Sequence, residues 1–113
     1  MAEGRLDLLP GTLELLVLRT LSLAPMHGWG IAQRIGVMSA GTFEVNQGSL
    51  YPALQRMKRR GWVRSEWRVT EHNRRARYYV LTAAGTQRLE NERQDWEQAY
   101  RAVNRVLSWQ GAL

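Results

Sequence analysis

The residues that decide the fold are Gln47-Gly-Ser-Leu-Tyr-Pro-Ala-Leu-Gln-Arg-Met57, which are followed closely by a stretch of β-forming residues. Apolar side chains at positions 50, 53, 54 and 57 recur at helical spacing, which predicts a helix that ends at Gly61. Asn46 is a suitable N-cap for this helix. A second start, with Ser49 as the cap, stays open because Pro52 removes a backbone hydrogen bond inside a helix and fits best in the first turn.

A β-hairpin is predicted directly after this helix. The segment from Trp62 to Val69 is rich in β-forming residues and alternates in character. Polar residues from Thr70 to Arg75 lead into a second strand from Ala76 to Leu81. The hairpin therefore has a basic, polar tip.

Two helices are expected before this unit. The first runs from Pro10 to Ala24 and is apolar almost all round, so it needs burial on two faces, the second of which another subunit could cover. A turn over residues 24–28 leads into a short helix from Gly28 to Met38. Beyond it, Phe43 to Val45 could pair as a very short strand.

The last part of the chain predicts a long helix, capped by Thr82 and reaching about Trp109. Apolar residues recur in it every seven residues, which is the spacing of a coiled-coil seam. So short a seam is not stable as a lone helix, and a chain this small buries only about two-thirds of its unfolded surface. We therefore expect a homodimer with the interface residues Leu13, Val17, Leu89, Trp96, Ala99, Tyr100, Val103, Val106 and Leu107.

The predicted order is helix, helix, helix, hairpin, helix. Three helices and a hairpin form a winged helix-turn-helix, in which the third helix fits the DNA major groove and the hairpin reaches the flanking backbone. The expected fold class is thus mainly α with a β-hairpin. Residues 1–81 would form the winged helix-turn-helix DNA-binding domain and residues 82–113 the C-terminal dimerisation helix, as one compact unit without a linker.

The net charge of +6 is concentrated in one stretch. Residues 56–77 hold nine Lys or Arg against two acidic residues, whereas residues 1–55 sum to −1 and residues 82–113 sum to zero. Such a cluster attracts a polyanion over a long range, although a solvated basic face is the alternative. The cluster begins on the predicted third helix and ends on the hairpin, which favours DNA.

Composition also argues against several classes of function. The chain has no cysteine, which excludes disulfides, thiol catalysis and thiolate metal sites. No acid or nucleophile shares the spacing of His27 and His72, so we expect no metal, no cofactor and no enzyme activity, with His27 as a cap or packing residue. The apolar stretches are too short to span a bilayer and the first residues lack the features of a secretion signal, so a cytoplasmic protein is expected.

The chain resembles the PadR family of bacterial transcriptional regulators. The resemblance extends over about residues 8–107, and its two most specific parts are the runs Gly48-Ser-Leu-Tyr-Pro-Ala-Leu54 and Arg74-Arg-Ala-Arg-Tyr-Tyr-Val-Leu-Thr82. Met57 stands where leucine is usual, which is a volume-conserving change. Further matching segments are Pro10-Gly-Thr-Leu-Glu-Leu-Leu-Val-Leu18, Met26-His-Gly-Trp-Gly-Ile31, Arg60-Gly-Trp62 and Ala84-Gly85.

This resemblance implies properties that the residues alone do not establish. Members of the family are homodimers joined through the last helix together with the first. They usually repress transcription from pseudo-palindromic operators, and a small molecule or a stress signal often relieves the repression. A single C-terminal helix is similar to the shorter of the two family subgroups.

Residues of the third helix and the hairpin are the candidates for contact with a DNA operator. They are Gln47, Ser49, Tyr51, Gln55, Arg56, Arg59, Asn73, Arg74, Arg75 and Arg77. The ring of Tyr51 could instead cover the hairpin, and Arg77 could be structural. Arg56 could equally form an ion pair with Glu66 or Glu44. The same holds for Arg59.

Trp96 has two candidate roles. A large aromatic side chain at a seam position is expected to be interface core. The resemblance adds a second role, a flat wall for a small planar aromatic effector at the dimer axis, because some short members of the family hold aromatic compounds there. Trp67 and Trp109 are expected to serve packing.

The sequence therefore predicts a sequence-specific DNA-binding transcriptional regulator. The resemblance to the family implies that this regulator is a repressor. The alternative is a winged-helix module that binds a protein and has lost DNA binding. That alternative predicts a neutral or acidic third helix and hairpin, which this chain lacks.

Overall fold

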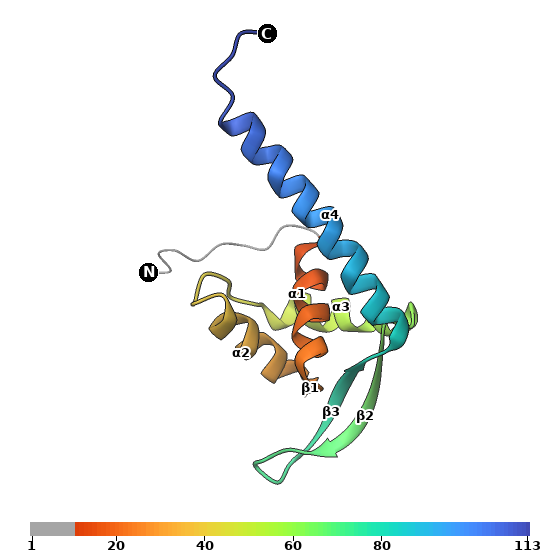
Figure 1. The fold of residues 1–113 in the computed structure, drawn as a ribbon. Helices are drawn as coiled ribbons and strands as arrows, with labels where there is room; N and C mark the ends of the chain where they lie inside the picture. The colour runs from red at the N-terminus through yellow and green to blue at the C-terminus, as the bar shows by residue number, and fades with distance from the viewer. Residues whose placement is uncertain (1–10) are drawn as a thin grey trace.

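The computed structural model describes residues 11–113 and contains, within them, four helices and a three-stranded antiparallel sheet (Figure 1). In chain order the elements are α1 (Thr12–Leu23), β1 (Met26–His27), α2 (Gly28–Met38), α3 (Gln47–Arg59), β2 (Val63–Val69), β3 (Arg75–Leu81) and α4 (Ala83–Leu107). Three helices, a hairpin and a long last helix follow one another as predicted. The winged helix-turn-helix fold is confirmed.

The core lies where α1, α2, α3 and the base of the hairpin meet. The buried positions of α3 are those of the predicted stripe: Leu50, Ala53, Leu54 and Met57. Burying one large apolar side chain contributes about 1.5–3 kcal/mol. From α2, Ile31 and Ile35 enter this core, and their burial holds in place a helix that its glycines weaken.

The burial of α1 corrects one expectation about the dimer interface. Val17 has no exposed surface within the single chain, because its own neighbouring elements cover it, so it cannot contact another subunit in this conformation. Leu13 and Leu89 are partly buried against the same core. Contacts between α1 and α4 of one chain therefore cover part of the apolar surface that the sequence assigned to a partner.

The start of α3 is fixed by Asn46. Its side-chain oxygen accepts a hydrogen bond from the Gly48 amide at 2.6 Å, so the alternative start with Ser49 as the cap is wrong. Pro52 lies inside the helix and removes only the backbone bond to the carbonyl of Gly48. The burial of the α3 stripe outweighs that loss.

The other helix starts also follow from capping. His27 caps α2 as expected, because its Nδ1 accepts a hydrogen bond from the Gly30 amide at 3.0 Å. Thr82 caps α4 in the same way, by accepting from the Gly85 amide at 3.0 Å. The predicted start of the first helix at Pro10 lies outside the described residues.

The segment between α1 and α2 holds a strand where the sequence predicts only a turn. Met26 and His27 form β1 and pair with Tyr79 and Tyr78 of β3. A strand of two residues has no sequence pattern of its own, since it forms only where an existing sheet edge offers it a partner. The strand that could form over residues 43–45 is absent, and Phe43 makes only an isolated bridge.

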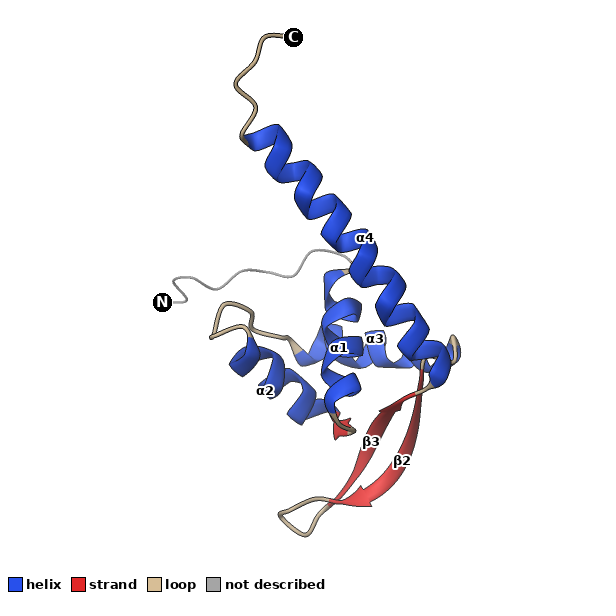
Figure 2. Cartoon of the chain, in the orientation of Figure 1, coloured by secondary structure: helices blue, strands red, loops and turns tan. Residues whose placement is uncertain are grey.

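The hairpin of β2 and β3, residues 63–81, is called the wing here, and it extends away from the body of the molecule (Figure 2). Its register pairs Trp67 with Arg77 and Val69 with Arg75. Cross-strand partners point to the same side of a sheet and successive residues to opposite sides. These four side chains therefore share one face of the wing, and Glu66 lies on the other.

The two halves of α4 differ in environment. The first half packs against α1, whereas the second half projects from the body and gives the molecule extents of 62 × 37 × 21 Å. The helix ends at Leu107, two residues before the predicted end. Its large exposed apolar residues are Trp96, Tyr100, Val103, Val106 and Leu107, with exposed fractions from 48% to 78%.

Candidate nucleic-acid interface

The outer face of α3 carries side chains predicted to contact DNA. Because the apolar stripe takes one side of the helix, Gln55 and Arg59 are turned to the opposite side, where both are exposed. Ser49 is also exposed, and Gln47 is half-buried. Amide and guanidinium groups are those that bind base edges in a major groove.

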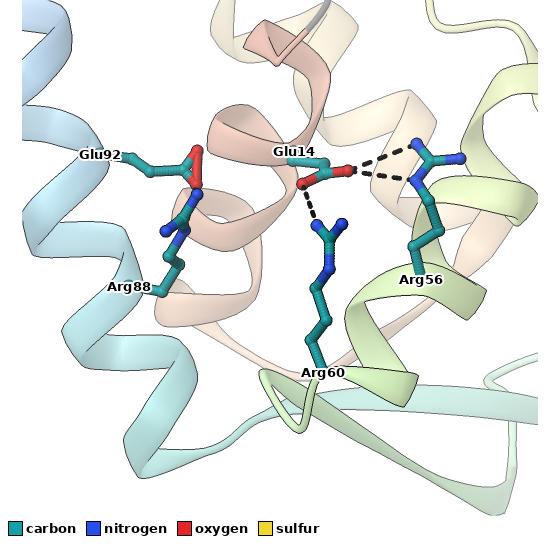
Figure 3. Close-up of polar contacts among 5 residues, drawn as sticks. All are labelled: Glu14, Arg56, Arg60, Arg88 and Glu92. Carbon is teal, nitrogen blue, oxygen red and sulfur yellow. Dashed lines mark hydrogen bonds and ion pairs between the residues drawn. The ribbon is translucent and has the colours of Figure 1, made fainter.

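Arg56 lies at the edge of this face and is held by an acidic residue of α1. Its Nε and Nη2 donate to Oε2 of Glu14 at 3.4 and 3.3 Å, and Nη1 of Arg60 lies 3.8 Å from Oε1 of Glu14 (Figure 3). The Glu14 side chain is only 15% exposed. Arg56 thus pairs with neither Glu66 nor Glu44, the partners weighed from the sequence, and a DNA contact would require it to share or leave Glu14.

Tyr51 lies against the start of α2. A Cβ atom at Gly28 would stand 2.7 Å from the Tyr51 hydroxyl oxygen, so a larger residue there would displace this ring. The side chain remains 43% exposed. Its hydroxyl can therefore still donate to a phosphate at the junction of α2 and α3.

The tip of the wing is ordered by Thr70. Its Oγ1 accepts hydrogen bonds from the amides of His72 and Arg74, each at 3.3 Å. Asn73 has a φ of 59°, a left-handed conformation that asparagine tolerates, so it has a turn role besides the predicted phosphate contact. The Arg74 side chain is exposed and pairs with no acidic group of residues 11–113.

Two further wing cations share an aromatic support. The guanidinium carbons of Arg75 and Arg77 lie 5.1 and 4.9 Å from the ring centroid of Trp67. Trp67 is 55% exposed, so the packing expected of it is with these two side chains and not in the core. Along β3, the core extends as far as Tyr79. Burial raises the pKa of the Tyr79 hydroxyl above its ordinary value.

On the opposite face of the wing, Glu66 binds two arginines and cancels one of their two charges. Its carboxylate accepts from Nη1 of Arg64 at 2.5 Å and from Nε of Arg68 at 2.9 Å. The hydrogen bond from Arg68, followed by that from Arg64, holds the pKa of Glu66 below its ordinary value. The N–H groups engaged in these bonds are not free for a phosphate.

A cleft of about 860 Å³ opens between the wing and α2. Arg34 and Trp29 of α2 line one side, and Arg74, Arg75 and Arg77 line the other. Sequence reasoning missed Arg34 and Trp29 because they lie in a part of the chain without excess charge. Only the fold brings α2 beside the wing.

Trp96 occupies the junction of α1 and α4. Its ring stacks on Tyr100, with centroids 5.1 Å apart and an interplanar angle of 13°. It also borders a shallow hollow of about 330 Å³, whose rim includes Asp95 and the ion pair of Arg88 with Glu92, at 2.8 Å between Nε and Oε2. An aromatic wall of this kind is chemically suited to a flat or cationic compound.

Two features are absent from residues 11–113. In that range no cluster of three or more His, Cys, Asp or Glu side chains is arranged to hold a metal ion. None of the helices there combines the length and the apolar character that crossing a membrane requires.

The chain is similar to known regulators in sequence and in structure. The profile of the Transcriptional regulator PadR-like family matches residues 17–91. A PadR-like transcriptional regulator from Bacillus cereus is 25% identical, with a TM-score of 0.76 and coverage of 88% of this chain and 95% of that chain. A PadR family transcription regulator from hypervirulent Clostridium difficile is 27% identical, with a TM-score of 0.74 and coverage of 87% and 100%.

A further relative is similar over most of its length. The uncharacterized protein X of Lysinibacillus sphaericus is 21% identical over 100 residues, which are 88% of this chain and 92% of that protein. The family match extends from α1 through the core, α3 and the wing into α4. The chain belongs to the PadR-like family of transcriptional regulators, which bind DNA and are not enzymes.

Proposed function

We propose that this protein is a repressor that binds a specific DNA operator as a homodimer, with α3 in the major groove and the wing on the flanking backbone. The observation that carries the proposal is a set of cations on α3 and the wing that pair with no acidic group within residues 11–113. They are Lys58, Arg59, Arg74, Arg75 and Arg77. A cation without a carboxylate keeps its charge and its N–H groups for phosphates and bases.

The test begins with the DNA. Sequencing the genomic DNA recovered with the protein should give a pseudo-palindromic operator with half-sites about 34 Å apart, one helical turn of DNA. A reporter driven by the recovered promoter should then be less active when the protein is present. Higher reporter activity would show an activator, and recovery of unrelated DNA would contradict sequence-specific binding.

Dimerisation through α4 is supported by its exposed apolar half. The side chains of Trp96, Ala99, Tyr100, Val103, Val106 and Leu107 are exposed in one chain, and so large an apolar surface marks an interaction site. A second copy would cover them, with Leu13 and Leu89 at the margin. Sedimentation at low micromolar concentration should give about twice the chain mass of 13.0 kDa. A well-folded monomer under those conditions would contradict this part.

Relief of repression is assigned to the region of Trp96, although a stress signal remains an alternative input. A flat ligand wedged between Trp96 and the same residue of the second subunit would tilt the two α4 helices and so change the spacing of the two α3 helices. A ligand shifts DNA binding only by its differential affinity for the two dimer shapes, commonly about 1–3 kcal/mol. The aromatic face of Trp96 favours a planar aromatic or cationic compound.

Fluorescence titration with planar aromatic compounds, run in parallel with operator binding, tests this site. The native protein should bind such a compound and lose operator affinity. Trp96→Leu keeps the seam apolar but removes the flat wall, so it should lose the ligand and still bind the operator. If Trp96→Leu binds the ligands as well as the native protein does, Trp96 is interface core only.

A further inference from the structure

The wing carries one large apolar side chain that the core does not explain. Trp67 is 55% exposed on β2, beyond the place where the wing joins the core through Tyr79. With this much of the ring in water, about half of the stabilisation that full burial would provide is lost. The role of Trp67 therefore has to be inferred from the side chains that its ring contacts.

Both contacts of the ring with cations come from the neighbouring strand. The register places Arg77 directly opposite Trp67, and Arg75 is one pleat further along the same face. Both guanidinium groups lie over the indole, at 4.9 and 5.1 Å from its centroid. A guanidinium stacked on an aromatic face keeps its full charge, and its N–H groups lie in its own plane, where an anion can still reach them.

The other face of the same wing shows what a carboxylate does instead. Glu66 takes N–H groups of Arg64 and Arg68 into hydrogen bonds and cancels one charge. Glu66 and Trp67 thus have opposite effects on anion binding by the arginines that they contact. Glu66 occupies N–H groups that could bind an anion, whereas Trp67 orders the guanidinium groups and leaves their charge unchanged.

We propose that Trp67 is a positioning residue that holds the guanidinium groups of Arg75 and Arg77 in place for neighbouring phosphates of the DNA backbone. The inference rests on the proposed DNA binding. A long arginine side chain loses rotational freedom when it binds a phosphate, and the stack removes part of that freedom beforehand. Trp67 therefore raises DNA affinity through the two arginines and not through a base contact of its own.

The experiment measures the affinity for a labelled, mixed-sequence DNA duplex at low salt, because phosphate contacts do not depend on sequence. Trp67→Leu keeps an apolar side chain but removes the aromatic face, and it should bind about fivefold more weakly, which is the order expected for two exposed cation–π contacts. Trp67→Phe keeps an aromatic face and should stay within about twofold of the native protein. Val69→Thr, on the same strand and face, is the control and should bind as the native protein does.

A double-mutant cycle separates positioning from other roles. In a chain that also carries Arg75→Gln and Arg77→Gln, Trp67→Leu should have no further effect, because nothing is left to position. An equal loss in both backgrounds would show that Trp67 touches DNA or supports the wing fold, and it would overturn the proposal. So would native affinity in Trp67→Leu, or a loss in Trp67→Phe as large as that in Trp67→Leu.

The failure of this inference is distinguishable from the failure of the proposed function. If the native protein binds no duplex even at low salt, DNA binding itself is refuted and Trp67 has nothing to position. If the native protein binds with a steep salt dependence and the Trp67 variants bind equally well, only the positioning role is refuted.

Discussion

Two groups of cations lie within residues 56–77, and the fold gives them different partners. One group shares two carboxylates: Arg56 and Arg60 with Glu14, and Arg64 and Arg68 with Glu66. The other group has no carboxylate partner within residues 11–113 and consists of Lys58, Arg59, Arg74, Arg75 and Arg77. A count of charge along the sequence treats the two groups alike, and the structure separates them.

The partner of each cation decides whether it stabilises the fold or is available to a ligand. The Glu14 pairs lie at the junction of α1 and α3, where they join two elements (Figure 3). The second group lies on the outer face of α3 and on the wing. We therefore expect substitutions in the second group to change DNA binding and substitutions in the first to change mainly stability.

The largest effect is expected on the outer face of α3. Arg59→Ala should lose about 1–3 kcal/mol of discrimination for the operator over a variant with one changed base pair, if its guanidinium contacts a guanine in bidentate fashion. Gln55→Ala should act in the same direction at a neighbouring base pair. The measurement is the affinity for the operator and for a set of single-base variants. A uniform loss across all sequences would place Arg59 on a phosphate and contradict base recognition.

A smaller and different effect is expected on the wing. Arg74→Ala should weaken binding to every sequence alike and make the log–log dependence of affinity on salt shallower by about 0.9 for each phosphate that the variant no longer neutralises. Arg64→Ala is the matched control, because it removes the same charge from a side chain that Glu66 already engages. If both variants change the salt slope equally, the two groups of cations do not differ in function.

The sequence predicts those parts of this molecule that depend on local pattern. The apolar stripe of α3, the caps at Asn46 and Thr82 and the hairpin all appear as expected, because each follows from neighbouring residues. The contact of Arg56 with Glu14 joins residues 42 positions apart, and no local pattern encodes it. The strand β1 and the cleft beside α2 likewise exist only once the elements have packed.

A third prediction concerns stability. Glu14→Gln should lower the free energy of unfolding by about 1 kcal/mol, because Glu14 is mostly buried while both of its arginine partners are about half exposed. The measurement is urea unfolding at a fixed protein concentration, since a dimer gains stability with concentration. Glu97→Gln, an exposed position on α4 with a longer ion pair to Arg101, is the control and should cost less. An unchanged unfolding free energy in Glu14→Gln would show that the pair does not tie α3 to α1 in solution.

The smallest effect is expected at Glu66, and its dependence on pH identifies the cause. Hydrogen bonds from Arg68 and Arg64 hold the pKa of Glu66 below its ordinary value of 4.5, so the carboxylate is more acidic in the folded than in the unfolded chain. A group with a lowered folded pKa stabilises the fold above its unfolded pKa, and this contribution is lost as the pH falls through the folded value. Glu66→Gln should therefore unfold at a slightly lower temperature than the native protein at pH 7, and the difference should vanish as acid protonates the native carboxylate.

In DNA binding, the same variant should gain less than about twofold, because the freed arginines lie on the wing face opposite Arg75 and Arg77 and salt screens charges beyond about 8 Å. A gain as large as the loss in Arg74→Ala would mean that both faces of the wing reach the backbone. In that case Glu66 would be a restraint on DNA binding, and the separation into two groups of cations would fail at the wing while it still held at α3.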